Sequence, residues 1–191
     1  MNREQAWSIV TEYTQSESLR RHMLAVEAAM RAYAQRFGGD EETWGITGLL
    51  HDFDYERYPD VAVEGHPVVG SRILRERGVP DEIIKGILSH AEEITGVKPE
   101  TTMEKALVAV DELTGFLIAV ALVRPSKSIL DVEISSVKKK WKDKLFAAPV
   151  NRAEIEHAAA ALGVPIEEHI QVVLASMKAN AAALGLVGTT A

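Results

Sequence analysis

Apolar residues recur at intervals of three and four along most of the chain, which is the spacing of amphipathic helices. The clearest stripe predicts a helix over residues 17–37, and Gly38 and Gly39 mark its end. Its apolar members are Leu19, Met23, Val26, Met30, Tyr33 and Phe37, with His22 at the edge of the stripe. This helix is expected to bury one face and to hold a histidine beside that face.

The next segment, residues 40–52, is apolar on nearly every side, which is typical of a central helix. Asp40 is its expected N-cap. The segment ends on His51 and Asp52, and ionisable groups in such a buried place need partners. Gly48 lies three residues before His51, so we expect it to leave room beside the imidazole for an ion or ligand.

Two shorter helices follow. Pro67 is a favourable first helical residue, which makes His66 the predicted N-cap of a helix that reaches about Arg77. After Gly78, the sequence Pro80-Asp81 is expected to start another helix. His90 lies near its end, on the apolar stripe of Ile83 and Ile87.

Residues 106–123 form a long apolar stretch that raises the question of a membrane span. It contains Asp111 and Glu112, and acids in the middle of a membrane cost several kcal/mol, so we predict a buried core helix. Glu112 faces another direction than Asp111 and is expected to pair with a cation elsewhere. Gly115, one turn after Asp111, is a second small residue beside a candidate ligand.

Further helices are predicted at about 151–162 and 165–184, and the tail 185–191 is expected to be frayed. The run SVKKKWKDK at 136–144 is interpreted as an amphipathic helix that buries Val137, Trp141 and Leu145. Strand-like alternation is confined to 128–137. The prediction is an all-α, single-domain helical bundle of 191 residues, with C-terminal helices at about 135–184.

The composition and net charge of the chain exclude several classes of protein and of functional site. The net charge of −7 argues against a protein that coats nucleic acid, because phosphate neutralisation needs a basic face. The chain has no cysteine, which excludes disulfides, thiolate metal sites and cysteine nucleophiles. The first residues lack the apolar core of a signal peptide, so we expect a cytoplasmic protein without a membrane segment that folds alone or as an oligomer.

Candidate metal ligands recur at helix edges and ends in the first 111 residues. A single histidine on an apolar face is more often a hydrogen-bonded core residue than a ligand, but histidines and aspartates from several helices are how helical folds build metal sites. Asp54 is interpreted either as a solvated turn acid or as a group that orients His51 or a water. The set is His22, His51, Asp52, His66, His90 and Asp111.

The order of these residues resembles the HD-domain superfamily of metal-dependent phosphohydrolases, of the type called HDIG, over about residues 17–125. The segments that carry the resemblance are RRHMLAVEAAM, GLLHDFDYE, EGHPVVGSRIL, ILSHAEE and AVDELTGF. The resemblance implies an all-α fold. It implies that His22, His51, Asp52 and Asp111 hold one divalent metal, and that His66 and His90 hold a second metal that Asp52 bridges to the first.

The chain departs from the family pattern at two adjacent positions and lacks two subgroup motifs. Phe53 and Asp54 stand where the HDIG subgroup has Ile-Gly after His-Asp. Neither the glycine-tyrosine-proline segment of cyclic-dinucleotide phosphodiesterases nor the glutamate-aspartate motif of alarmone hydrolases is present, so those substrates are not expected.

The resemblance implies hydrolysis of a phosphoester or nucleotide-like substrate by a metal-activated water, with Asp52, His66 and His90 as catalytic residues. One or two divalent metals are expected, from Fe, Mn, Zn, Co and Ni, with Mg as a further candidate. Arg21, Arg124 and Lys127 are candidate phosphate contacts, and solvated surface cations are the equal alternative for each.

Two other functions stay open at this point. Some proteins of this fold bind a pair of irons and activate oxygen, and six donors suit that chemistry too. The chain is alternatively a non-catalytic metal- or nucleotide-binding regulatory module, with the lysine run at 136–144 as its docking surface. His157 and His169 lie outside the motif and are interpreted as structural.

Overall fold

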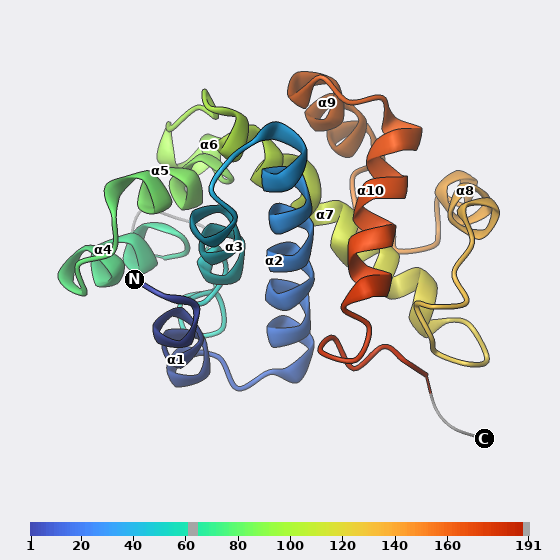
Figure 1. The fold of residues 1–191 in the computed structure, drawn as a ribbon, viewed down its shortest axis with the longest axis horizontal. Coiled ribbons are helices and arrows are strands. Elements are labelled where there is room, and N and C mark those ends of the chain that lie inside the picture. Colours follow the sequence, from blue (N-terminus) through green and yellow to red (C-terminus); the bar gives the residue numbers. More distant parts are fainter. Residues whose placement is uncertain (61–64, 189–191) are drawn as a thin grey trace.

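The computed structural model describes residues 1–60 and 65–188, and within them the fold is all-α (Figure 1). No strand occurs in these two ranges. Their only extended pairing is an antiparallel bridge between Ser128 and Val187. The helices are α1 (Arg3–Tyr13), α2 (Glu17–Phe37), α3 (Glu41–Leu50), α4 (Val68–Glu76), α5 (Asp81–Ser89), α6 (Glu92–Thr95), α7 (Thr102–Leu122), α8 (Ile134–Lys142), α9 (Arg152–Leu162) and α10 (Ile166–Ala179).

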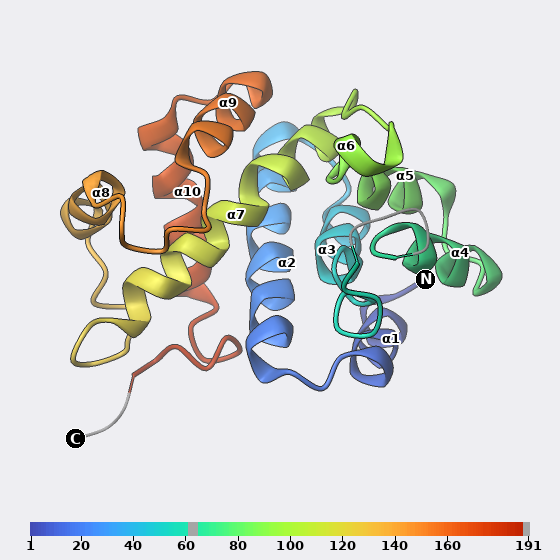
Figure 2. The same ribbon diagram turned by 180° about the vertical axis from the view of Figure 1, so that it is seen from behind.

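The long helices α2 and α7 occupy the middle of the molecule (Figures 1 and 2). Helices α1, α3, α4 and α5 lie on one side of α2, and α8, α9 and α10 lie on the other. The buried apolar residues follow this division. One cluster joins α2 and α7 to α9 and α10, and a smaller cluster joins α1, α3, α4 and α5.

Helix α3 is central, as its sequence predicts: every residue from Trp44 to Leu50 is buried. Gly48 allows its close contact with α2, because a Cβ at that position would lie 2.9 Å from Met30 Cγ and 3.1 Å from the Val26 carbonyl oxygen. The expectation that Gly48 leaves room for an ion beside His51 is therefore wrong. The missing side chain is needed for packing between two helices.

Capping explains most of the helix boundaries near the candidate ligands. The side chains of Ser16 and Asp40 accept hydrogen bonds from the first turns of α2 and α3, as expected for Asp40, and Gly38 ends α2 at a φ of 70°. Helix α4 begins only at Val68 with Pro67 as its N-cap, so His66 lies before the helix and is not its N-cap.

The C-terminal region differs from its prediction in three places. Helix α10 ends at Ala179 rather than near 184. The tail is packed as far as it is described, because Leu186 is buried and its carbonyl oxygen accepts a hydrogen bond from Ile129 N at 2.8 Å. Residues 189–191 lie outside the described ranges. Val137 and Trp141 of α8 pack on the core as expected, but Leu145 follows the helix and is almost fully exposed.

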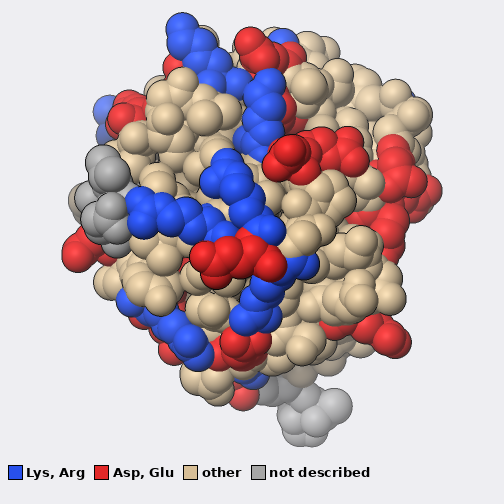
Figure 3. Space-filling model, turned by 90° about the vertical axis from the view of Figure 1, so that its left-hand side faces the viewer, with Lys and Arg blue, Asp and Glu red and all other residues tan. Residues whose placement is uncertain are grey.

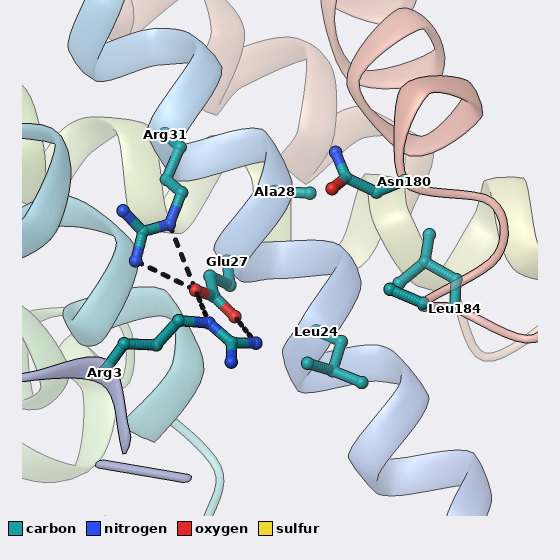
Figure 4. A pocket seen from close by; sticks show the side chains of 8 residues that line it. Arg3, Leu24, Glu27, Ala28, Arg31, Asn180 and Leu184 are labelled. Atoms are coloured by element: carbon teal, nitrogen blue, oxygen red, sulfur yellow. Dashed lines mark hydrogen bonds and ion pairs between the residues drawn. The ribbon is translucent and has the colours of Figure 1, made fainter. Parts of the chain in front are cut away.

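A buried acid outside the candidate ligands ties α1 to α2 (Figure 4). Glu27 of α2 accepts hydrogen bonds from Arg3 Nε at 2.7 Å and Arg3 Nη2 at 2.9 Å, and from Arg31 Nε at 3.0 Å. Asn180 and Leu184 line the other side of the same pocket (Figure 4). Two guanidinium groups therefore compensate this buried carboxylate.

Helix α7 is a buried core helix, as predicted, with apolar contacts on most of its length. Among the described residues, no single helix is long and apolar enough to cross a membrane. By length and composition alone, one bent pair meets the criteria, Arg152–Ala161 with Ile166–Ala179, at an angle of 96°.

Candidate metal centre

The fold brings the six predicted donors to one place from five parts of the chain. His22 lies in α2 and Asp111 in α7, the two long central helices. The others lie at helix ends: His51 and Asp52 directly follow α3, His66 lies two residues before α4, and His90 directly follows α5.

Four of these side chains form a first group of donors. His22 Nε2 lies 2.9 Å from Asp111 Oδ1 and 3.7 Å from Asp52 Oδ2. His51 Nε2 lies 3.4 Å from both of these oxygens. Two imidazole nitrogens and two carboxylate oxygens so close together are the type of donor set that binds a divalent transition metal.

A second group lies on the other side of Asp52. His66 Nε2 is 3.2 Å from Asp52 Oδ1 and 3.2 Å from His90 Nε2, and His90 Nε2 is 3.7 Å from the same oxygen. Asp52 thus directs Oδ2 towards the first group and Oδ1 towards the second. A carboxylate placed in this way can bridge two cations.

The hydrogen bonds at Nδ1 fix which nitrogen of each ring faces the centre. His51 Nδ1 donates to the Gly48 carbonyl oxygen at 2.8 Å, and His90 Nδ1 donates to the Ile87 carbonyl oxygen. His66 Nδ1 donates to Asp54 Oδ1 at 2.7 Å. Each neutral ring then carries its proton on Nδ1 and presents the lone pair of Nε2 to the centre, which is the arrangement of metal-ligating histidines.

His22 also presents Nε2 to the centre, because its Nδ1 is hydrogen-bonded to Thr114. The Thr114 hydroxyl donates to the Asp111 carbonyl oxygen at 2.8 Å, so it accepts a hydrogen bond from His22 Nδ1 at 3.3 Å. Thr114 was not among the predicted site residues. Its position three residues after Asp111, on the same face of α7, is the sequence signal that indicates it.

Two features of the centre fit a cation. His51 Nε2 is fully buried and has no hydrogen-bond partner, although such a nitrogen normally has one. The Nε2 atoms of His66 and His90 face each other at 3.2 Å, so either a proton on one ring or a cation between the two rings satisfies both nitrogens. The donors therefore fit divalent metal at both groups.

Charges in the first group compensate one another. Burial by itself lowers the pKa of His51, but the carboxylates of Asp52 and Asp111 outweigh burial and hold this pKa well above its usual value. Burial likewise opposes charge on the two acids, and the positive His51 nevertheless lowers the pKa of each well below its usual range. Without metal, a proton on His51 supplies the positive charge that these acids require.

In the second group, the pKa values of the two histidines are shifted in opposite directions. Burial opposes protonation of His66, but its hydrogen bonds to Asp52 and Asp54 raise its pKa to about 9. Burial and the charge of His51 lower the pKa of His90. Metal binding at this group therefore has to displace a proton from His66.

Asp54 positions His66, so it is neither a solvated turn acid nor a partner of His51. Its side chain is buried rather than solvated, and it accepts hydrogen bonds from His66 Nδ1 and from Gly70 N at 2.8 Å, not from His51. A Cβ at Gly70 would lie 2.6 Å from Asp54 Oδ2. The departure from Ile-Gly thus has a structural reason, because Phe53 is also buried and packs with the smaller apolar cluster.

The predicted phosphate contacts are not gathered at the donors. Arg124 follows α7, about 20 Å along the helix axis from Asp111, and its Nη1 donates to Ser136 Oγ at 3.2 Å. Lys127 lies farther along the chain, in a loop. Arg21 is next to His22, but its Nε donates to the Leu184 carbonyl oxygen at 2.8 Å.

Three further sequence interpretations concern residues near the centre or outside it. Glu112 accepts a hydrogen bond from the backbone N–H of Asn151 at 2.9 Å instead of pairing with a cation. His169 is structural, as predicted: it is buried and joins Tyr33 of α2 to the Ala109 carbonyl oxygen of α7. His157 is exposed on α9.

Comparison with known proteins gives one match. The model of the HD domain family matches residues 19–115, about half of the chain, and this range contains all six donors. No curated protein and no solved structure matches the chain. The matched range, the all-α fold and the converging histidines and aspartates agree with one another. The chain belongs to the HD domain family, within the superfamily of metal-dependent phosphohydrolases.

Proposed function

We propose that this protein hydrolyses a phosphoester or nucleotide-like substrate with the help of two divalent cations that share Asp52. The observation that carries the proposal is the orientation of Asp52, whose two oxygens face two separate groups of histidines. An arrangement with a shared carboxylate is typical of sites that act on phosphorus through paired metals.

The donors suit Fe, Mn, Zn, Co or Ni, because imidazole nitrogens dominate, and Mg is a further candidate. Bound divalent cations would supply an acidified water as the nucleophile and positive charge for the developing negative charge at phosphorus. Asp52, His66 and His90 face a common space, and in the proposal they act by holding the cation that would supply the attacking water. Asp54 and Thr114 keep His66 and His22 in the orientation that this role needs.

The exposure of the donors supports access from one side. The side chains of His22, Asp52 and Asp111 are 18%, 17% and 23% exposed, whereas His51 is fully buried. A substrate phosphate can therefore approach over these three residues while His51 closes the base of the centre.

The proposal is tested with a panel of phosphomonoesters and phosphodiesters, assayed with each candidate metal after chelation. We expect phosphate release or diester cleavage that depends on added metal. His51→Ala and Asp52→Ala should abolish it, while Asp131→Asn, an exposed acid outside the centre, should not. Wild-type protein that takes up metal but cleaves no member of the panel would contradict the proposal.

An oxygenase with a pair of irons is the second candidate, favoured by the six nitrogen and oxygen donors around two positions. The requirement for oxygen distinguishes the hydrolase from the oxygenase. Turnover with Mn or Mg under anaerobic conditions supports the hydrolase, whereas oxygen uptake that requires iron supports the oxygenase.

A further inference from the structure

A pocket of about 440 Å³ opens beside the metal centre, and His22 forms part of its wall. This size lies within the range of small-molecule pockets. Because the exposed side of the donors includes His22, a phosphate held at the centre would carry its organic group towards this pocket. The other lining residues are Ser16, Ser18, Leu19, Tyr55, Glu56 and Pro59.

The walls offer apolar and aromatic contact. Tyr55 is 41% exposed, and its ring meets the ring of His66 edge to face at 5.3 Å between centroids. Leu19 and Pro59 add aliphatic surface to the lining. Tyr55 thus extends from a ligand of the second group into the pocket, so a flat group that contacts its ring lies next to the reacting phosphate.

The described residues that line the pocket include no lysine or arginine. Among these described lining residues the one acidic side chain is that of Glu56, whose Oε2 accepts hydrogen bonds from Gln15 N at 2.9 Å and Ser16 N at 2.8 Å. A carboxylate at this place repels a second anionic group on a substrate.

The arginines nearest in sequence are held elsewhere. Arg20 donates to the Thr14 carbonyl oxygen at 2.7 Å, Arg21 donates to that of Leu184, and Arg57 donates to that of Glu12. Backbone carbonyl oxygens thus accept at least one hydrogen bond from each of these guanidinium groups and direct it away from the pocket. Recognition of several phosphates normally uses such groups, free and directed at the ligand.

We infer, on the basis of the proposed function, that the substrate is a phosphomonoester whose organic group is uncharged and has an apolar or aromatic face. Tyr55 selects that group by contact with its ring. Pyrophosphates and substrates with a second charged group distant from the phosphate are disfavoured, because the described residues of the pocket offer them a carboxylate and no cation.

Binding of non-hydrolysable phosphonates to Mn²⁺-loaded protein tests the inference by calorimetry. Phenylphosphonate should bind about tenfold more tightly than methylphosphonate, since an aromatic contact in a pocket is worth about that factor. 4-Carboxyphenylphosphonate should lose most of this advantage, because its carboxylate would approach Glu56. Equal affinity for phenyl- and methylphosphonate, or preference for the carboxylated compound, would overturn the inference.

Substitutions test whether the preference for phenylphosphonate over methylphosphonate arises in the pocket. Tyr55→Ala should remove most of the phenyl-over-methyl preference, and Tyr55→Phe should keep it. Phe37→Ala is the matched control, because Phe37 is 40% exposed and lies about 22 Å from His22 along α2. Ser18→Lys adds a cation at the exposed edge of the pocket and should improve binding of the carboxylated compound severalfold. If Tyr55→Ala leaves the preference unchanged, Tyr55 does not select the organic group.

Measurements of phosphomonoester turnover distinguish a failure of this inference from a failure of the proposed function. If phenyl phosphate is hydrolysed and the phosphonate preference is absent, the pocket assignment fails and the hydrolase stands. If the preference depends on Tyr55 but no phosphomonoester is cleaved, the pocket assignment is supported and hydrolysis is contradicted.

Discussion

Each histidine of the centre has its Nδ1 hydrogen committed, so the orientation of every ring depends on one neighbouring acceptor. For His51 and His90 the acceptor is a backbone carbonyl oxygen of the preceding helix, which no side-chain substitution removes. For His66 and His22 it is a side chain, Asp54 or Thr114. Metal affinity at the second group should therefore be sensitive to Asp54.

Asp54→Asn tests this dependence. The amide is a weaker acceptor for His66 Nδ1 and lacks the charge that compensates the ring, so metal affinity at the second group should fall about 10- to 100-fold. Competition with a chelating dye measures the affinity. The control is Asp131→Asn, which changes an exposed acid and should leave it unchanged. Equal affinities in Asp54→Asn and wild type would show that Asp54 does not position His66.

The protonation of His66 predicts how metal binding depends on pH. Its pKa of about 9 in the metal-free protein means that the ring is charged below that pH, and a ligand has to be neutral. Affinity at the second group should therefore rise with pH up to about 9, by up to about tenfold per pH unit for the proton displaced from His66, and level off above that pH. Calorimetry in buffers of different ionisation enthalpy counts the released protons. Affinity that is independent of pH over this range would contradict the assignment.

At the scale of the elements, the close contact between α2 and α3 fixes His22 relative to His51 and Asp52. Gly48→Ala should separate these helices, because its Cβ would lie 2.9 Å from Met30 Cγ and 3.1 Å from the Val26 carbonyl oxygen. We expect a loss of about 1–3 kcal/mol in the free energy of unfolding.

Gly115→Ala is the matched control, because this glycine lies within α7 and a Cβ there meets no atom within 4 Å. It should stabilise the protein by about 0.5–1 kcal/mol. Thermal denaturation with metal present measures both variants. If Gly48→Ala is as stable as wild type, the contact does not require glycine.

The sequence predicts the elements best where a stripe and its caps agree. The apolar stripe of α2, ended by glycines, and the Asp40 cap of α3 are both observed. The end of α10 was predicted too late, because Leu184 is buried by a turn that follows the helix and its position mimics helical spacing. The four-residue α6 was not predicted, since it has no buried residue to mark a stripe.

For the candidate site, too, only part of the arrangement could be predicted from the sequence. The six donors could be identified because their order matches a known pattern and helix edges place them near one another. The role of Gly48, the partner of Asp54 and the contribution of Thr114 depend on which helix lies opposite. Helical spacing describes only the helix that carries it, so these contacts could not be predicted from it.

At the scale of the whole molecule, the metal centre joins helices from both apolar clusters. His22 and Asp111 belong to α2 and α7, and the remaining donors lie at the ends of α3, α4 and α5. The side of the molecule that carries α4 and α5 shows side chains of both signs next to one another (Figure 3). Ion pairs at these helices include Arg77 with Glu12 and Lys85 with Glu100, each at 2.7 Å. A centre that connects the two clusters should contribute to the stability of the fold.

Removal of metal tests this coupling. A ligand that binds only the folded state stabilises it by about 2.7 kcal/mol at a free concentration 100 times its Kd. Chelation should therefore lower the Tm by several degrees, and added metal should restore it. Asp52→Ala protein, which lacks the carboxylate shared by both groups, should have a Tm that responds little to chelator. A wild-type Tm that is equally insensitive would contradict a structural contribution of the metal.

Six side chains converge on two groups of donors that share Asp52, and we expect each group to hold one cation. Elemental analysis of the protein, as purified and after dialysis against each candidate metal, measures this. We predict about two divalent ions per chain in wild type, about one in His90→Ala, and fewer than one in Asp52→Ala. Wild-type protein that contains no metal and takes up none on titration would contradict the account.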